Sequence, residues 1–166
     1  MLHEYDEALR VGKVMDELDY YWYESPMPES DEYIAQYIEL KKHIRTPLIG
    51  GETAPDAHEK RFEWLHAGAT DWGRLDIFNG GLTSCFLVTI ECEKMGLPMD
   101  LHCAMYPHIN VFAATSEDLI PFVGGYGVPL WTNPDAKGYL PISDHIGVGD
   151  EPDLDFVTYN PIDWVC

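Results

Sequence analysis

Hydrophobic residues follow two different periods along the first two thirds of the chain, and the two periods alternate. In five stretches apolar side chains recur every three to four residues, which is typical of helices that bury one face. Between them lie short apolar runs bounded by Gly, Pro or acidic residues, which are typical of buried strands. We expect helices at about residues 4–18, 30–43, 56–67, 79–95 and 108–114, and strands at 20–24, 47–50, 71–77 and 98–102.

Four consecutive aromatic residues, 20–23, make the most distinctive of the strand patterns. Aromatic side chains favour the pleated surface of a sheet, and no polar residue interrupts the run, so we expect a buried strand. Glu24 follows directly, and the Ser-Pro-Met-Pro segment after it cannot continue the strand, because proline supplies no N–H to the ladder. Glu24 is therefore expected at the carboxyl end of a buried strand, where ligands and catalytic groups gather in parallel α/β proteins.

Repeated strand–helix units with short connections predict an α/β fold with parallel strands. A polar residue follows or ends each expected strand, at positions 24, 52, 76 and 102, with separations of 28, 24 and 26 residues. These separations are close to the ~30 residues of one unit in an eight-stranded (βα)8 TIM-type barrel. A doubly wound sheet fits the period too, but the chain has neither a G-x-G-x-x-G motif after a strand nor a Walker loop. We therefore favour a partial barrel.

The last third of the chain has a weaker pattern. We expect the (βα) units to span residues 1–145 and a C-terminal tail segment to span residues 146–166. Residues 121–138 are rich in Gly, Pro and Asn and predict an irregular loop, and a short strand is expected at 139–142.

The four polar residues at the strand ends are candidates for a catalytic site. Glu24 and Glu52 would point into one mouth, where two like charges need a cation between them, and carboxylate oxygens suit Mg²⁺. Asp76 and His102 would follow at the next strand ends, and a carboxylate beside an imidazole makes a general acid/base. Such a set fits abstraction of a proton next to a carboxylate group, with the metal stabilising the enediolate. Taken singly, each residue also fits a structural role, such as capping a loop.

Composition narrows the possible partners and location. The 166 residues suffice for one domain, and the formal net charge of −19 argues against nucleic acid, whose phosphates would be repelled. That charge fits either adaptation to high intracellular salt or an ordinary acidic protein. No apolar run approaches the ~20 residues that cross a bilayer, and the acidic start does not resemble a signal peptide. The four cysteines lack C-x-x-C spacing, so we expect reduced thiols and a cytoplasmic location.

Several motifs, taken together and in order, resemble those of one family. They are Trp-Tyr-Glu-Ser-Pro-Met-Pro at 22–28, Pro-Leu-Ile-Gly-Gly-Glu at 47–52, Gly-Ala-Thr-Asp at 68–71, Gly-Gly-Leu-Thr at 80–83 after Asp76, Gly-Leu-Pro-Met at 96–99 before His102, and Ile-Gly-Val-Gly at 146–149 before Asp-Phe at 155–156. This pattern resembles the C-terminal part of the mandelate racemase/muconate lactonizing enzyme group of the enolase superfamily. The resemblance covers roughly residues 5–157.

The resemblance implies a modified barrel that binds Mg²⁺ at the ends of its strands. Glu24 and Glu52 match two of the group's three usual ligands. Asp76 and His102 match the acid/base pair of the racemases and of many acid-sugar dehydratases. The substrate would be a small hydroxy acid or sugar acid, and the leading expectation is a dehydratase, a lyase. A racemase or epimerase, or a catalytically inactive barrel fragment, are the alternatives.

The chain departs from the group's pattern at several points. The sequence has no counterpart of the first ligand, an Asp, of the lysine base, of the first strands or of the N-terminal capping domain. One residue fewer than usual separates Asp76 from Gly80, and Phe122 stands near the place of a Glu on the last strand. A partial barrel has open edges that must be paired or covered, so we expect a homo-oligomer or assembly with a missing N-terminal fragment.

Overall fold

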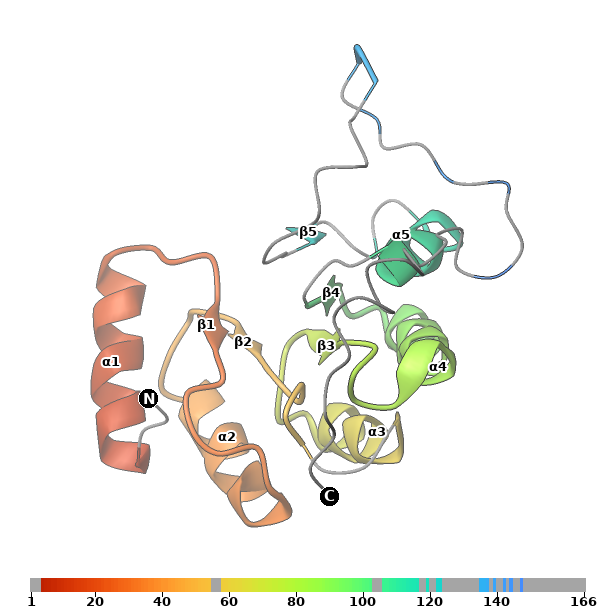
Figure 1. Ribbon diagram of the computed structural model, residues 1–166. Coiled ribbons are helices and arrows are strands. Elements are labelled where there is room, and N and C mark those ends of the chain that lie inside the picture. The colour runs from red at the N-terminus through yellow and green to blue at the C-terminus, as the bar shows by residue number, and fades with distance from the viewer. Residues whose placement is uncertain are drawn as a thin grey trace, which may run out of the picture.

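The structure, a computed structural model, describes residues 4–54, 58–102, 106–116, 119, 122–123, 135–137, 139, 142, 144 and 147. Helices and short strands alternate along the described chain (Figure 1). In order, the elements are α1 (Tyr5–Glu17), β1 (Tyr23–Glu24), a 3₁₀ turn (Asp31–Tyr33), α2 (Ile34–Lys41), β2 (Leu48–Ile49), α3 (His58–Ala67), β3 (Gly73–Leu75), α4 (Gly81–Met95), β4 (Met99–Leu101), α5 (Tyr106–Ala113) and β5 (Phe122–Val123).

The five described strands are parallel and neighbour one another in chain order. β1 pairs with β2, β3 pairs with β4, and β4 pairs with β5. A parallel bridge between Ile49 and Trp72 joins the two groups. A doubly wound sheet reverses its strand order at a switch point, whereas the described strands continue in one direction. The fold is therefore a run of consecutive (βα) units from a barrel, which confirms the predicted α/β class.

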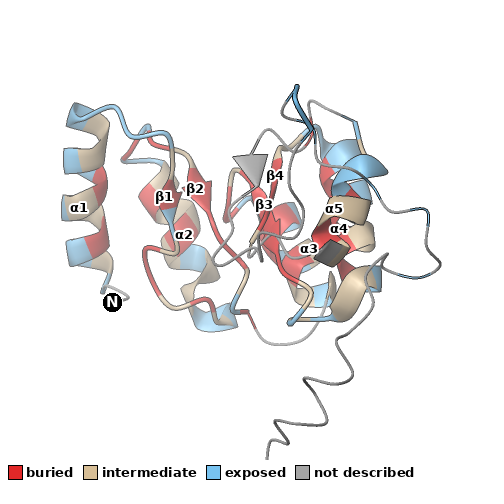
Figure 2. Ribbon diagram, turned by 45° about the horizontal axis from the view of Figure 1, so that its top comes forward, coloured by how far each residue is buried: buried red, intermediate tan, exposed pale blue. Residues whose placement is uncertain are grey.

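Helices flank the strands and bury two apolar clusters against them (Figure 2). The first cluster joins α1 and α2 to β1 and β2, and Tyr37 meets Trp64 of α3 edge to face with ring centroids 4.7 Å apart. The second cluster joins α3, α4 and α5 to β3 and β4. Together the clusters fix the strands from one side, so that polar side chains of alternate strand residues face away from the helices.

A close approach between a helix and a strand lies at Gly73, the first residue of β3. A Cβ atom at Gly73 would overlap Cys92 Sγ of α4 and lie 3.6 Å from Met99 Sδ. Cys85 and Cys92 are buried free thiols, and burial raises the pKa of Cys85 to about 11 and that of Cys92 to about 12. Such thiols stay protonated and unreactive at neutral pH. Cys103 and Cys166 lie outside the described residues.

Some expectations about local structure are wrong. Tyr20 and Tyr21 do not belong to the buried strand, because they are 54% and 65% exposed and only Tyr23 and Glu24 pair with β2. Tyr21 packs edge to face on Trp22 and Trp72 instead, with ring centroids 5.2 and 5.8 Å away. The aromatic side chain of Tyr21 therefore packs in a cluster with two tryptophans instead of in the sheet.

Two further expectations concern the ends of the chain. Residues 122–123 lie in the segment expected to be an irregular loop, yet they form β5 and pair with Asp100 and Leu101 of β4. Backbone pairing to a neighbouring strand decides this segment, and pairing leaves little trace in so short a sequence. The expected strand at 139–142 lies partly, and the tail segment at 146–166 almost wholly, outside the described residues. In the part of the chain that is described, no helix is long and apolar enough to cross a membrane.

Asp16, near the end of α1, ties this helix to the segment that precedes β2. Its carboxylate accepts hydrogen bonds from the backbone N–H of Arg45 at 2.9 Å, from the N–H of Thr46 at 2.7 Å and from Thr46 Oγ1 at 2.7 Å. Partial burial alone would raise the pKa of Asp16, but the hydrogen bonds from Thr46 and Arg45 bring it below its ordinary value. The charged form of Asp16 therefore stabilises the fold.

We expect Asp16→Asn to lower the free energy of unfolding by about 1–2 kcal/mol at pH 7, because the charged acceptor of three hydrogen bonds is lost. The folded pKa lies below the unfolded one, so the contribution is present above about pH 4 and is lost as the pH falls through the folded value. Urea unfolding at pH 7 and at pH 3 measures both effects. Glu17→Gln on the exposed neighbour is the control, and an equal loss at both pH values would contradict the role of the charge.

Candidate active site

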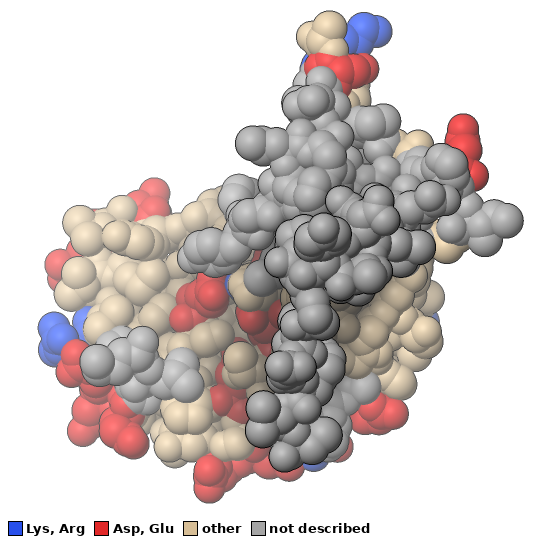
Figure 3. Space-filling view, in the orientation of Figure 1, with Lys and Arg blue, Asp and Glu red and all other residues tan. Residues whose placement is uncertain are grey.

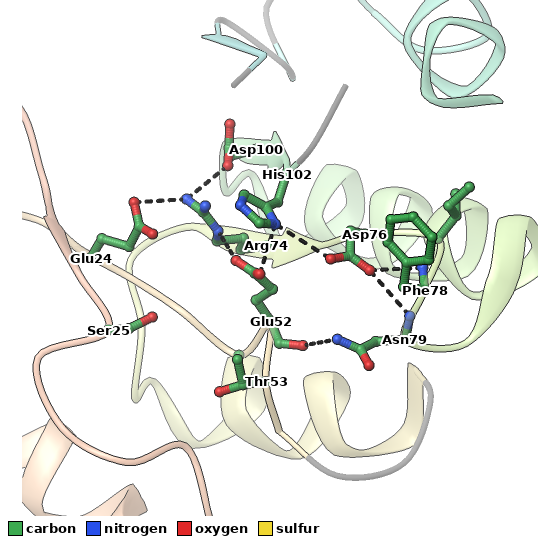
Figure 4. Close-up of polar contacts among 12 residues, drawn as sticks. Glu24, Ser25, Glu52, Thr53, Arg74, Asp76, Phe78, Asn79, Asp100 and His102 are labelled. Atoms are coloured by element: carbon green, nitrogen blue, oxygen red, sulfur yellow. Dashed lines mark hydrogen bonds and ion pairs between the residues drawn. The ribbon is translucent and has the colours of Figure 1, made fainter. Parts of the chain in front are cut away.

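Asp76 and His102 lie side by side because β3 and β4 are parallel and in register. Arg74 pairs with Asp100 and Leu75 with Leu101, so the next step along both strands brings Asp76 opposite His102. His102 Nδ1 lies 3.3 Å from Asp76 Oδ2. The other oxygen, Oδ1, accepts hydrogen bonds from the N–H groups of Phe78 at 2.7 Å and Asn79 at 3.1 Å. The turn into α4 therefore fixes the carboxylate that faces the imidazole (Figure 4).

Glu52 makes the shorter contact with the imidazole. Its Oε1 lies 2.7 Å from His102 Nδ1, and its Oε2 lies 2.6 Å from Arg74 Nε. One carboxylate thus bridges a histidine and an arginine from two neighbouring strands (Figure 4). With both Glu52 and Asp76 on the same nitrogen, the proton of a neutral imidazole is favoured on Nδ1.

The loop that presents Glu52 is held by a buried carboxylate, Glu29, which is 4% exposed. Glu29 accepts hydrogen bonds from the N–H of Gly51 at 2.7 Å, from the N–H and Oγ1 of Thr53 at 2.7 and 2.6 Å, and from Ser25 Oγ at 2.8 Å. A Cβ atom at Gly50 would lie 2.6 Å from Glu29 Oε1, so glycine is required for this approach. The loops after β1 and β2 are therefore joined through one side chain.

Arg74 lies at the centre of three carboxylates. Its Nη1 is 3.1 Å from Glu24 Oε2 and 3.0 Å from Asp100 Oδ2, and its Nε is 2.6 Å from Glu52 Oε2. The side chains of Arg74 and Asp100 are only 5% and 2% exposed. Burial alone would lower the pKa of Arg74, but Asp100, Glu52 and Glu24 raise it above its ordinary value. The guanidinium is therefore a permanent positive charge of this site.

The four residues predicted from the sequence share this site in two groups. Asp76 and His102 are in contact, as expected for an acid/base pair. Glu24 and Glu52 both contact one cation, but that cation is Arg74. Glu24 is the outermost member, with a side chain that is 46% exposed.

Sequence reasoning missed Arg74 and Asp100, although a signal for them exists. Each lies two residues before a predicted site residue, Asp76 or His102. Side chains two apart on a strand share a face, so these four had to form two layers on one side of β3 and β4. The same rule applied inward from the strand ends would have placed Arg74 and Asp100 on the side of the site, while their pairing depends on the register of β3 and β4.

A second set of atoms could hold a metal ion. Glu52, Asp76 and His102 each offer one ligand atom, and these atoms all lie within 4.8 Å of one another. Two carboxylates and an imidazole suit a borderline metal better than a hard one. Four carboxylates surround one guanidinium and one imidazole here, so negative charge is in excess, and Figure 3 shows acidic side chains in the middle of this face.

Comparisons with known proteins agree with this fold. A family model described as "Enolase C-terminal domain-like" matches residues 3–156, and no curated protein matches the chain. Among solved structures, D-glucarate dehydratase from Agrobacterium tumefaciens, complexed with magnesium, is 25% identical over 96% of this chain and 44% of its own, with a TM-score of 0.78. A racemase from Streptomyces coelicolor A3(2) with bound magnesium is 16% identical over 95% and 44%, with a TM-score of 0.79.

A third solved structure resembles the chain in the same way. L-talarate/galactarate dehydratase from Salmonella typhimurium LT2 is 22% identical over 89% of this chain and 38% of its own, with a TM-score of 0.71. The chain thus spans less than half the length of all three proteins. The racemase and the talarate dehydratase show the shared fold, and all three similarities run through most of this chain.

Proposed function

The chain belongs to the enolase C-terminal domain-like family, and on that premise we propose that it transfers a proton at the carbon next to the carboxylate of a small hydroxy acid or sugar acid. The observation that carries this proposal is an imidazole held at the ends of parallel strands by two carboxylates. His102 Nδ1 lies 2.7 Å from Glu52 and 3.3 Å from Asp76. Solved relatives in fold include both acid-sugar dehydratases and a racemase, and either reaction begins with this proton transfer.

In this proposal His102 carries the proton and Asp76 and Glu52 position it. A proton on Nδ1, facing both carboxylates, assigns the exchange with substrate to Nε2. After Nε2 accepts the proton, the two negative charges stabilise the imidazolium. In a dehydration the imidazolium would return the proton to the departing hydroxyl. In a racemisation the carbon must receive a proton on the opposite face, so His102 would serve one face of the substrate only.

Magnesium is the cofactor that the resemblance implies, and the fit of Glu24 and Glu52 to it is incomplete. Their carboxylate oxygens are the donors that Mg²⁺ prefers. However, the Arg74 guanidinium fills the gap between them, at 3.1 Å from Glu24 and 2.6 Å from Glu52. As the side chains lie, these residues do not fit a divalent ion at that place.

A second candidate function is a catalytically inactive barrel protein that assembles with another chain. The excess of negative charge around His102 favours it, because such a site repels an anionic acid. Among the described strands, β1 and β5 each pair on one side only. Self-association or a partner fragment would cover these edges.

Deuterium exchange into a panel of sugar acids and hydroxy acids, followed by NMR, tests the enzymatic proposal. We expect the wild type to exchange the proton next to the carboxylate of at least one acid, and His102→Asn to slow that exchange by at least about a hundredfold. His43→Asn, at an exposed residue just after the end of α2, is the matched control and should exchange like the wild type. Equal exchange in His102→Asn would rule out the proposed role of His102. A wild type that exchanges none of the acids would support the inactive protein.

A further inference from the structure

The gap between Glu24 and Glu52 already contains a positive charge that belongs to the chain. Glu24 ends β1 and Glu52 follows β2, and the Arg74 side chain reaches both from β3 (Figure 4). Asp100 of β4 holds the same guanidinium at 3.0 Å. The cation of β3 therefore has carboxylate partners from three other parts of the fold: β1, the loop after β2, and β4.

The position of Arg74 is set by the sheet itself. Arg74 and Asp100 are directly paired residues of two parallel strands, so their ion pair follows from the register. Both side chains are almost fully buried. If the guanidinium left this place, three carboxylates would lose their ion pair with Arg74. The buried Asp100 would then keep its negative charge without the positive charge of Arg74, which is strongly unfavourable.

We infer that Arg74 is a built-in counter-ion that takes the place of a divalent cation between Glu24 and Glu52, so that the chain does not bind Mg²⁺ there. This inference goes beyond the proposed function and does not rest on it, because a proton could be transferred by His102 with either cation in place. It concerns only what occupies the space between two carboxylates.

Charge and geometry both support this assignment. A divalent ion between Glu24 and Glu52 would compete for these carboxylates with Arg74, whose Nε contacts Glu52 Oε2 at 2.6 Å, and it would lie next to the guanidinium charge. Repulsion between a divalent ion and a unit charge at that distance weakens binding by orders of magnitude at an effective dielectric constant of about 20. Arg74 also leaves the other oxygen of Glu52 directed at His102 Nδ1. The guanidinium thus positions the carboxylate that contacts the imidazole.

Calorimetric titration with MgCl₂ at constant ionic strength tests the inference on the full chain, with Glu24→Gln reporting whether bound metal lies at this place. We expect the single variant Glu24→Gln to have the same Mg²⁺ affinity as the wild type. Arg74→Met removes the charge but keeps much of the side-chain volume. We expect this variant to bind Mg²⁺ at least about a hundredfold more tightly than the wild type, and Mg²⁺ to raise its Tm. Adding Glu24→Gln to Arg74→Met should abolish the gain.

A wild type whose Mg²⁺ affinity falls tenfold or more in Glu24→Gln would overturn the inference, as would an Arg74→Met variant that folds and binds no better than the wild type. Should Arg74→Met fail to fold without metal, the comparison of wild type with Glu24→Gln still decides. Arg74→Lys, which keeps one positive charge, is the second variant and should gain less affinity than Arg74→Met. Because every readout is binding or Tm, failure here is distinct from loss of deuterium exchange in His102→Asn.

Discussion

Glu29→Ala is expected to lower the free energy of unfolding by about 4 kcal/mol. Glu29 is 4% exposed and accepts hydrogen bonds from four donors. Removing the acceptor leaves the backbone N–H groups of Gly51 and Thr53 and the hydroxyls of Ser25 and Thr53 without it, and buried donors of this kind cost about 1–3 kcal/mol each when unsatisfied. The space left behind adds to the loss.

Chemical unfolding of Glu29→Ala, Glu29→Gln and Glu32→Ala measures this effect. The glutamine variant keeps the shape but turns one acceptor into a donor that faces N–H groups, so we expect about half the loss. Glu32 is exposed and accepts a hydrogen bond from Ser30 Oγ at 3.1 Å, and its replacement should cost little. A loss below about 1 kcal/mol in Glu29→Ala would show that water satisfies the donors. Deuterium exchange into the acid substrate should also be slower in Glu29→Ala, because the loop that presents Glu52 is no longer held.

Gly73→Ala is expected to destabilise the fold by about 3 kcal/mol. The added methyl group would overlap Cys92 Sγ, which is buried in α4. Neither the first residue of β3 nor the last turn of α4, which holds the buried Cys92, can shift without disturbing its neighbours. Overpacking of this kind costs about 1–3 kcal/mol, occasionally more. Thermal and chemical unfolding provide the measurement.

Cys92→Ala distinguishes overlap from any other cause of that loss. Alone it should cost about 1 kcal/mol, because it removes a buried sulfur atom. Combined with Gly73→Ala it removes the atom in conflict, so the double variant should be about as stable as Cys92→Ala alone. The pair would then be strongly non-additive, as expected for residues in contact. Additive losses would mean that the close approach of α4 to β3 is not what makes Gly73 necessary.

The fold could be predicted from the sequence because the residues that end its helices act locally. Gly68 and Gly96 end α3 and α4 with φ of +71° and +67°, which glycine adopts without strain. Periodic apolar residues between such breaks gave the helices to within a few residues. The sequence did not predict β5, because two residues are too few to show a hydrophobic period. The strand was wrongly extended over Tyr20 and Tyr21, because a run of aromatic residues indicates packing but does not show that the packing is within a sheet.

The candidate site divides in the same way. Asp76 and His102 follow strands of recognisable pattern, and equal spacing on neighbouring strands brings them together. Arg74 and Asp100 lie within the strands, where a charged residue contradicts the apolar pattern that identifies a strand, so the pattern itself hides them. Their pairing depends on register, and register is a property of two segments that no single segment specifies. The contacts of Glu29 are likewise invisible, because they join loops more than twenty residues apart in sequence.

Arg74 is covalently part of the polypeptide, and this has a consequence for biogenesis. A metal-bound cluster of carboxylates is complete only after an ion has been delivered to the folded protein. Here the positive group is synthesised in the same chain as the acids that it contacts, so the ratio between them does not depend on the supply of an ion. The ends of β1, β3 and β4 can therefore be drawn together as the chain folds, without a loading step.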